Sequence, residues 1–354
     1  MNMSEIGEKA FLRELLTTLN PSHRFINGFG DDASLLNVDL PKLLSLKIDR
    51  AASPIASVKN WCDYKLWGRI AVTSNCSDIL ACGGIPYGMM LAISVPKDFE
   101  SKKVIEIIQG ADDECRVNNV AYLGGDTKEA REANIVGCAV GLNEKDFCLS
   151  RRNIKQGDLI VLAGQLGGYM GSYLSTLEHQ KIHGNVNGCN DYIHYMSNPK
   201  AKWEEAKFIR EQKLATAGMD LSDGLLDVLV TMTDGILGAE IEIDKLPFHN
   251  FARICADNFS LNITNFAFTV GDWGIVFSIP HEKKEDVKLA IKKGLNLTII
   301  GRWTDTKKNI AVNKSGDKFL INGIINEHFV RRMEDQGDYM RSVRHNISLK
   351  PILE

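Results

Sequence analysis

The sequence predicts an α/β fold, in the broad sense that includes α+β, with mixed sheets and two domains. Apolar segments of strand length alternate with amphipathic helical segments along the 354 residues, yet they do not form regular parallel strand–helix–strand units. A chain of this length typically folds as two domains, each large enough to bury its own core. The polar stretch from Ser150 to Asp158 interrupts the alternation, so we expect one domain over residues 1–149 and a second over residues 150–354.

The N-terminal half contains three helical patterns and four apolar runs. A helix is expected where apolar residues recur every three or four positions, and a strand where a short apolar run is bounded by turn residues. These rules predict helices over residues 5–19, 64–81 and 102–117, and strands over residues 43–48, 89–95, 121–123 and 135–142. Gly83 and Gly84 mark the end of the second helix, and a glycine-rich loop over residues 124–127 follows the third strand.

The C-terminal half continues the alternation with shorter elements. The same rules predict strands over residues 158–163, 239–243, 266–269, 275–279 and 299–302, and helices over residues 202–212, 225–237 and 282–293. Residues 179–198 are rich in glycine, asparagine and histidine and indicate a surface insertion, while residues 216–223 indicate an acidic, glycine-containing loop. The polar tail from Asp335 onward has no assignable pattern.

Charge and cysteine usage exclude several classes of protein. The net charge is −3, so no general basic field attracts nucleic acid. The sequence has no run of 18 or more apolar residues and no signal-peptide pattern, so we expect neither membrane insertion nor secretion. The eight cysteines form no Cys-x-x-Cys pair, which disfavours a zinc site and indicates buried thiols in a reducing, cytoplasmic compartment.

Five separated acidic segments are the most informative feature. They are Gly30-Asp31-Asp32, Ile48-Asp49, Ser77-Asp78, Gly125-Asp126 and Asp220-Leu221-Ser222-Asp223-Gly224. Glycine lets the backbone approach a phosphate closely, and carboxylates are the ligands that bind Mg²⁺ together with nucleotide phosphates. If the segments converge, they predict a site for ATP with Mg²⁺. Each segment alone is more typical of an ordinary turn or, for Ser222-Asp223, of a helix cap.

Other nucleotide-binding motifs are absent from the sequence. It contains no Gly-x-x-x-x-Gly-Lys-Ser/Thr P-loop and no His-Arg-Asp loop of the protein kinases. A chain that uses ATP without these motifs must hold phosphate mainly through Mg²⁺ and glycine backbone.

The motifs and their order resemble the thiamine-monophosphate kinase family, which shares a two-domain fold with aminoimidazole ribonucleotide synthetase. The resemblance runs from residue 7 to about residue 303. It rests on residues 28–33, 75–83, 124–127, Arg151 with Gly157-Asp158, and residues 215–225. It implies an N-terminal domain that dimerises through its sheet to form a homodimer. The implied activity is transfer of a phosphoryl group from ATP to thiamine phosphate.

The resemblance also assigns roles to individual residues. The implied Mg²⁺ ligands are Asp31, Asp49, Asp78, Asp126, Asp220 and Asp223. The implied ATP contacts are Gly125, Asp126, Arg151 and Ser222, with Arg152 in place of Arg151 if the register shifts by one. Asp126, which would support both metal and nucleotide, and Asp223 are the implied catalytic residues.

The departures from the family lie on the acceptor side. The family's Ser-Thr-Asp reads Lys47-Ile48-Asp49, its Val-His-Phe has no counterpart in residues 53–57, and of its Gly-Gly-Glu-Asp-Tyr-Glu-Leu only Asp272 is retained. Lys47 either adds positive charge near the phosphates or is an ordinary solvated lysine. Three readings of the function therefore stay open. The protein phosphorylates thiamine phosphate, or it uses ATP to activate another small molecule on the same fold, or it binds nucleotide without turnover.

Overall fold

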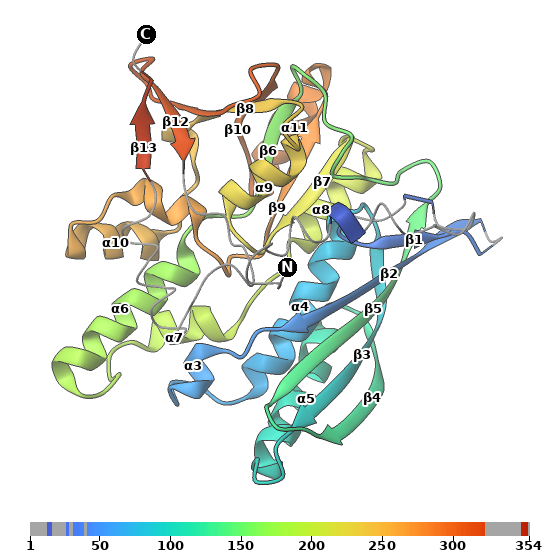
Figure 1. The fold of residues 1–354 in the computed structure, drawn as a ribbon, viewed down its shortest axis with the longest axis vertical. Coiled ribbons are helices and arrows are strands. Elements are labelled where there is room, and N and C mark those ends of the chain that lie inside the picture. Colours follow the sequence, from blue (N-terminus) through green and yellow to red (C-terminus); the bar gives the residue numbers. More distant parts are fainter. Residues whose placement is uncertain (1–12, 16–25, 28–30, 39–40, 323–347, 353–354) are drawn as a thin grey trace.

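The structure, a computed structural model, describes residues 13–15, 26–27, 31–38, 41–322 and 348–352 and contains two β-sheets (Figure 1). The smaller sheet has the order β1 (Ser34–Leu36), β2 (Lys42–Ala51), β5 (Asn134–Glu144), β3 (Ile85–Val95), β4 (Ala121–Glu129). The larger has the order β13 (Ser348–Pro351), β12 (Lys318–Asn322), β11 (Asn309–Val312), β8 (Gly238–Glu242), β10 (Leu297–Thr304), β6 (Leu159–Ala163), β9 (Gly274–Ile279), β7 (Ala217–Leu221). Each sheet has one parallel pair among antiparallel ones, which confirms the predicted mixed sheets.

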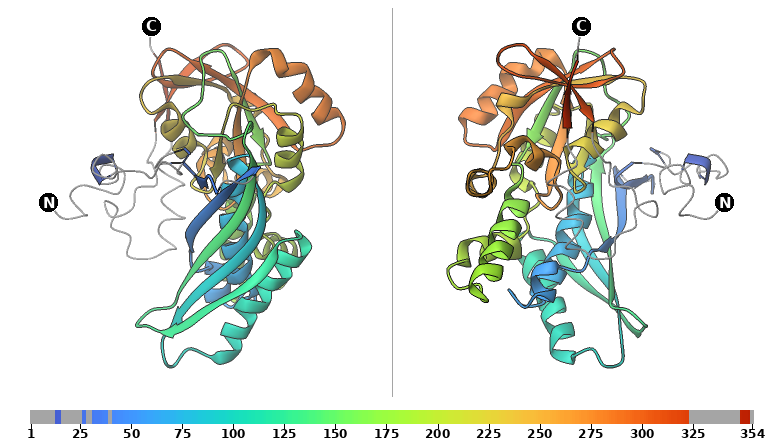
Figure 2. Two further views of the ribbon diagram at one scale, coloured as in Figure 1. Left: turned by 90° about the vertical axis from the view of Figure 1, so that its right-hand side faces the viewer. Right: turned by 60° about the vertical axis from the view of Figure 1, so that its left-hand side comes forward.

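The helices cover the sheets unequally. Their bounds are α3 (Ile55–Val58), α4 (Lys65–Ala81), α5 (Ser101–Val117), α6 (Gly168–His183), α7 (Asn190–Ser197), α8 (Trp203–Glu211), α9 (Leu225–Thr233), α10 (Asn250–Phe259) and α11 (Lys284–Lys292). Helices α4 and α5 pack on one face of the smaller sheet (Figure 2). Side chains of α6, α9 and α10 share one core with the larger sheet, and those of α8 and α11 share a second. Strands β6, β7 and β9 are buried along their whole length, as expected of strands covered on both faces.

Two glycines allow α4 and α5 to cross closely. A Cβ atom at Gly68 of α4 would lie 1.9 Å from the carbonyl oxygen of Ile107, and one at Gly110 of α5 would lie 2.0 Å from that of Lys65. Side chains at a helix crossing set the distance between the helix axes. The absence of a side chain on either glycine therefore brings the two backbones into contact.

Helix α4 joins the two halves of the molecule. Fourteen of its 17 residues are buried, and its side chains contribute to each of the three hydrophobic clusters found among the described residues. Its C-terminal end meets the larger sheet, where a Cβ atom at Gly218 of β7 would lie 2.2 Å from the carbonyl oxygen of Ala81. The last turn of α4 is thereby held beside strand β7.

Some segments differ from the sequence-based prediction. Residues 124–127 belong to β4 instead of forming a loop, because they continue the parallel pairing with β3. The segment predicted as an acidic loop over 216–223 consists mostly of strand β7, paired with β9. Residues 266–269 were predicted as a strand, but they fall in and just after a 3₁₀-helix over Ile263–Phe268.

The predicted surface insertion over residues 179–198 contains regular structure. It contains the end of α6 and the whole of α7, and Cys189 and Met196 within it are buried. The predicted helix over 225–237 ends at Thr233, because the chain then turns.

The chain ends and the domain boundary need separate mention. Of the helix predicted over residues 5–19 the structure describes only residues 13–15, and of the tail from Asp335 onward it describes only residues 348–352, which include strand β13. In the part of the chain that the structure describes, no helix combines the length and apolarity needed to cross a membrane. The division into residues 1–149 and 150–354 stays a prediction.

We expect Gly110→Ala to destabilise the fold even though alanine is the better helix former by about 1 kcal/mol. The added Cβ would meet backbone atoms of α4, and overpacking of this kind costs about 1–3 kcal/mol. Urea unfolding followed by circular dichroism measures the change. Gln109→Ala, at an exposed position of the same helix, should leave the free energy of unfolding nearly unchanged. A Gly110→Ala variant as stable as the wild type would contradict the close crossing.

Candidate active site

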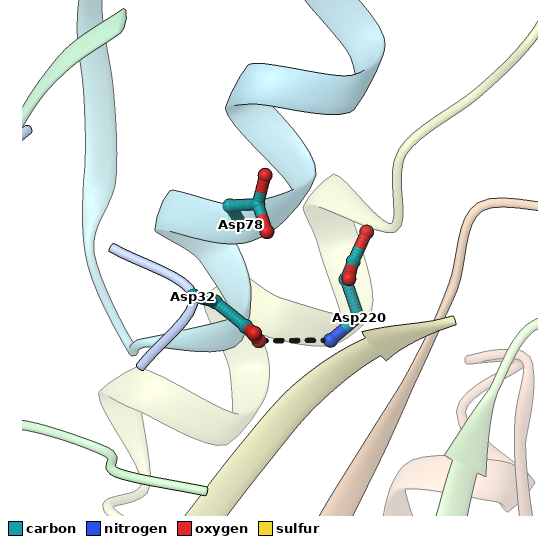
Figure 3. A group of neighbouring side chains, drawn as sticks. All are labelled: Asp32, Asp78 and Asp220. Atoms are coloured by element: carbon teal, nitrogen blue, oxygen red, sulfur yellow. Dashed lines mark hydrogen bonds between the residues drawn. The ribbon is translucent and has the colours of Figure 1, made fainter. Parts of the chain in front are cut away.

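Three buried aspartates from distant parts of the sequence form one cluster. Oxygen atoms of Asp32, Asp78 and Asp220 all lie within 4.8 Å of one another (Figure 3). The three residues are 4%, 4% and 5% exposed. Like charges this close are unfavourable unless cations compensate them, so the cluster indicates a cation site.

Each aspartate is positioned by a different element. Asp32 precedes β1, Asp78 lies in the last turn of α4, and Asp220 lies in β7. The backbone N–H of Asp220 donates a hydrogen bond to Oδ2 of Asp32 at 3.1 Å, which ties the N-terminal segment to the larger sheet. The C-terminal end of a helix carries partial negative charge. Because Asp78 lies at that end of α4, the helix adds to the negative potential of the site and favours the binding of cations.

Two basic side chains supply part of the compensation. Nζ of Lys47, from β2, lies 3.0 Å from Oδ2 of Asp78, and the guanidinium of Arg151 contacts the carboxylate of Asp32. Three carboxylates and two cations leave one net negative charge if all five groups are ionised. The cluster can therefore accept further positive charge.

Burial and mutual repulsion perturb the ionisation of these groups. Burial, then the nearby Asp220, raises the pKa of Asp78 well above its ordinary value, against the opposing effect of Lys47. Burial raises the pKa of Asp220 to about 7; Lys47 opposes this shift and Asp223 adds to it. For Lys47, burial acts to lower the pKa, but the charges of Asp78, Asp49 and Asp220 outweigh it and raise the pKa. The site thus favours the binding of cations to its carboxylates.

The strand register explains why Lys47 and Asp49 face this cluster. In β2 they pair with Ala139 and Gly137, which are buried on the side of the sheet that α4 covers. Ile48 lies between them and is 70% exposed on the opposite face. The charge of Asp49 acts on Asp78, Asp220 and Lys47, so Asp49 lies near the cluster without being one of its three converging residues.

Asp126 lies away from the cluster of its own chain. Gly125 of β4 and Asp49 of β2 lie in the same row of paired residues across the sheet. Strands β5 and β3 lie between β2 and β4, so three strand spacings, roughly 14 Å, separate the two residues. The next residue, Asp126, pairs with the exposed Ala92 and therefore lies on the open face of the sheet. Its side chain is 66% exposed and its charged neighbour is Lys128 at 3.9 Å.

The first of the two adjacent aspartates has a different environment. Oδ1 of Asp31 accepts hydrogen bonds from Oγ of Ser150 at 2.8 Å and from the backbone N–H of Arg151 at 3.1 Å. Its Oδ2 accepts from Asn27 at 3.0 Å and from Arg152 at 3.3 Å. Asp31 thus connects the N-terminal segment to the segment that links the two halves, while Asp32 points into the cluster.

The remaining predicted residues lie near β7. Oγ of Ser222 donates to Oδ1 of Asp220 at 3.4 Å, and Asp223 is close enough for its charge to raise the pKa of Asp220. Helix α9 begins after Gly224 without a side-chain cap, so this segment does not serve as the helix cap that the sequence also suggested.

The donor set fits a divalent cation of the Mg²⁺ type. Mg²⁺ binds carboxylate oxygens at about 2.0–2.1 Å and usually keeps several waters, and the spacing of the three aspartates allows one ion to contact more than one of them. Sequence reasoning included Asp78 and Asp220 but chose Asp31 over Asp32. No pattern in the neighbouring residues separates the two, because β1 is only three residues long and its buried residue, Leu35, shares the alternation of Asp31 and not that of Asp32.

The profile of the AIR synthase related protein N-terminal domain matches residues 30–143, and that of the C-terminal domain matches residues 155–313. These matches cover most of the chain, so the chain belongs to the AIR synthase related family.

Within that family the chain is a relative of the thiamine-monophosphate kinases. The enzyme of that name from Buchnera aphidicola subsp. Acyrthosiphon pisum is 31% identical over 331 residues, which are 88% of this chain and 97% of the relative. The one from Pyrococcus horikoshii is 30% identical over 237 residues, 66% of this chain and 70% of the relative. A solved structure described as AaThiL complexed with AMPPCP and TMP has a TM-score of 0.74 at 24% identity, covering 88% of this chain and 95% of that one, and it shares the fold.

We expect Asp220→Asn to stabilise the metal-free protein, and more so at pH 8 than at pH 5. The folded state keeps a proton on Asp220 up to about pH 7, whereas an unfolded aspartate loses it near pH 4. Stability from this group is therefore lost as pH rises from about 4 to 7, and a neutral amide avoids that loss. Thermal unfolding in EDTA measures the effect. The exposed Asp98→Asn serves as control, and a lower melting temperature of Asp220→Asn at both pH values would refute the repulsion.

Proposed function

We propose that the protein transfers the γ-phosphoryl group of ATP to the phosphate of thiamine monophosphate, giving thiamine diphosphate and ADP. The observation that carries the proposal is the cluster of Asp32, Asp78 and Asp220, together with Lys47 and Arg151, in a chain related to thiamine-monophosphate kinases. A protein of the same fold is described as complexed with AMPPCP and TMP. The partners are therefore small phosphate-bearing molecules.

The residues of the cluster would hold Mg²⁺ together with the phosphates of ATP. Asp32, Asp78 and Asp220 supply the carboxylate oxygens, and we keep Asp31, Asp49 and Asp223 as further ligands of the proposal. Asp126 lies on the opposite face of the smaller sheet, so we keep it as a ligand that would act from a second copy of the chain, across the dimer interface proposed below. When bound, Mg²⁺ neutralises phosphate charge and stabilises the charge that develops at a transferring phosphoryl group.

The protein groups would otherwise act by positioning. Arg151 presents a guanidinium whose fork geometry suits phosphate oxygens, and Gly125 and Ser222 remain the proposed backbone and hydroxyl contacts. A phosphoryl transfer between two bound phosphates needs alignment and charge compensation, and it needs no covalent bond to the enzyme.

We further propose a homodimer formed through the open face of the smaller sheet. Helices α4 and α5 cover only the other face, and the open face presents apolar side chains on three of its strands. Ile48 of β2, Met90 of β3 and Leu123 of β4 are 70%, 38% and 57% exposed. An apolar sheet face of this kind is typical of an interface. Asp126 lies on the same face and would belong to that interface.

A cytoplasmic location remains part of the proposal. All eight cysteines lie in the described part of the chain, and each is a thiol instead of half of a disulfide. Thiols persist in reducing compartments, which supports this location.

The direct test is incubation with ATP, MgCl₂ and thiamine monophosphate, followed by chromatography of the products. We expect thiamine diphosphate and ADP in equal amounts. Asp126→Asn should lower turnover on the order of a hundredfold or more, because a charge that supports metal and nucleotide is lost, while the exposed site leaves the fold intact. Asp98→Asn, at another exposed position, should behave as wild type. ADP without thiamine diphosphate would point to another acceptor, and undiminished activity of Asp126→Asn would refute its role.

For the dimer, we expect Met90→Glu to convert the protein to a monomer, because the substitution buries a carboxylate in the apolar interface. Light scattering coupled to size-exclusion chromatography measures the molar mass. Ile105→Glu places the same charge at an exposed position of α5, 54% exposed and behind the sheet, and should remain dimeric. If wild type and Met90→Glu have the same molar mass, this face is not the interface.

A further inference from the structure

Lys47 differs from an ordinary surface lysine. Its Nζ atom lies 3.0 Å from Oδ2 of Asp78, and its side chain is only 22% exposed. The register of β2 places it under α4, on the same side as Asp49. Lys42 on the same strand offers a contrast, because it pairs with Glu144 at 2.8 Å in a bridge whose side chains are 40% and 44% exposed.

The chemistry of the ammonium group limits what else can bind beside it. An ammonium group carries three hydrogen-bond donors and no acceptor, so it cannot ligate a metal ion. It is a compact positive charge that engages a carboxylate oxygen which a metal ion would otherwise use. Two cations on the same small group of oxygens would repel each other. Lys47 and a divalent cation therefore compete for the carboxylate of Asp78.

We propose that the ammonium group of Lys47 occupies one cation position of the cluster, so that the protein binds one divalent ion fewer than the same carboxylates would bind without it. The proposal rests on the metal–nucleotide site of the proposed function. Arg151 acts on Asp32 in a parallel way, so the cluster is partly neutralised from two sides by its own chain. Lys47 permanently supplies the positive charge that a metal ion would otherwise bring to Asp78, and this charge does not depend on the concentration of the metal.

Counting bound Mn²⁺ tests the proposal without measuring activity. Electron paramagnetic resonance detects unbound aqueous Mn²⁺, so a titration at fixed protein concentration gives the number of ions bound. With the ATP analogue AMPPCP present, a matched titration of AMPPCP without protein is subtracted, because the nucleotide also binds Mn²⁺. Lys47→Ser removes the charge and leaves space for an ion, and we expect it to bind one Mn²⁺ more per chain than wild type. Lys42→Ser is the same substitution on the same strand outside the cluster, and it should bind the wild-type number.

A second variant and a second readout cover the case in which Lys47→Ser is poorly stable. Lys47→Arg keeps the positive charge and should bind the wild-type number of ions. The melting temperature of Lys47→Ser in EDTA should be lower than that of wild type, and saturating Mn²⁺ should restore it more than it raises that of Lys42→Ser. Equal numbers of ions and equal Mn²⁺ responses in wild type and Lys47→Ser would overturn the inference and leave the proposed function intact. Absence of Mn²⁺ binding in every variant, with AMPPCP present, would overturn both.

Discussion

The mutual repulsion of buried carboxylates is the constraint on which the arrangement of this protein depends. Asp32, Asp78 and Asp220 are each almost inaccessible to water, and no one of them could remain ionised there without a nearby cation. Lys47 and Arg151 meet part of this requirement from within the chain. The elements that carry these five residues must therefore come together accurately. They include the segment before β1, strands β2 and β7, helix α4 and the segment that follows β5.

The same requirement connects folding to function. A site whose carboxylates outnumber the basic side chains beside them is less stable alone than with a positively charged ligand, because anything that binds only the folded state stabilises it. The hydrogen bonds around the site show how the protein limits this cost. Asp31 holds the linking segment through Ser150 and Arg151, and the amide of Asp220 donates to Asp32. Neutral backbone donors thus share the compensation with charged side chains.

The fold class and the main helices could be predicted from sequence because they follow from local periodicity. Helix α4, with Asp78 three residues before its end, appears almost as predicted. The acidic segments around Asp126 and Asp220 were expected to be loops because glycine and aspartate are frequent in turns, but pairing with β3 and β9 draws both into strands. Tertiary pairing of this kind overrides local preference.

The composition of the site was harder to predict for a related reason. That Asp78 and Asp220 approach Asp32, while Asp126 does not, depends on the order of strands in the sheet, and no local pattern encodes that order. Lys47 occupies a strand position whose parity places it toward α4, but a charged residue in that position conflicts with the usual apolar pattern. Only the structure shows that Asp78 resolves the conflict.

Helix α4 also bears on how such a protein can evolve. Separate domain profiles match the two halves of the chain, which would suggest modules that could be exchanged between relatives. Yet α4 is buried on nearly every side and packs into the cores of both halves. A half taken from another relative would have to match the shape of this helix as well as its own core. Substitutions along α4 must therefore satisfy the packing of both halves at once.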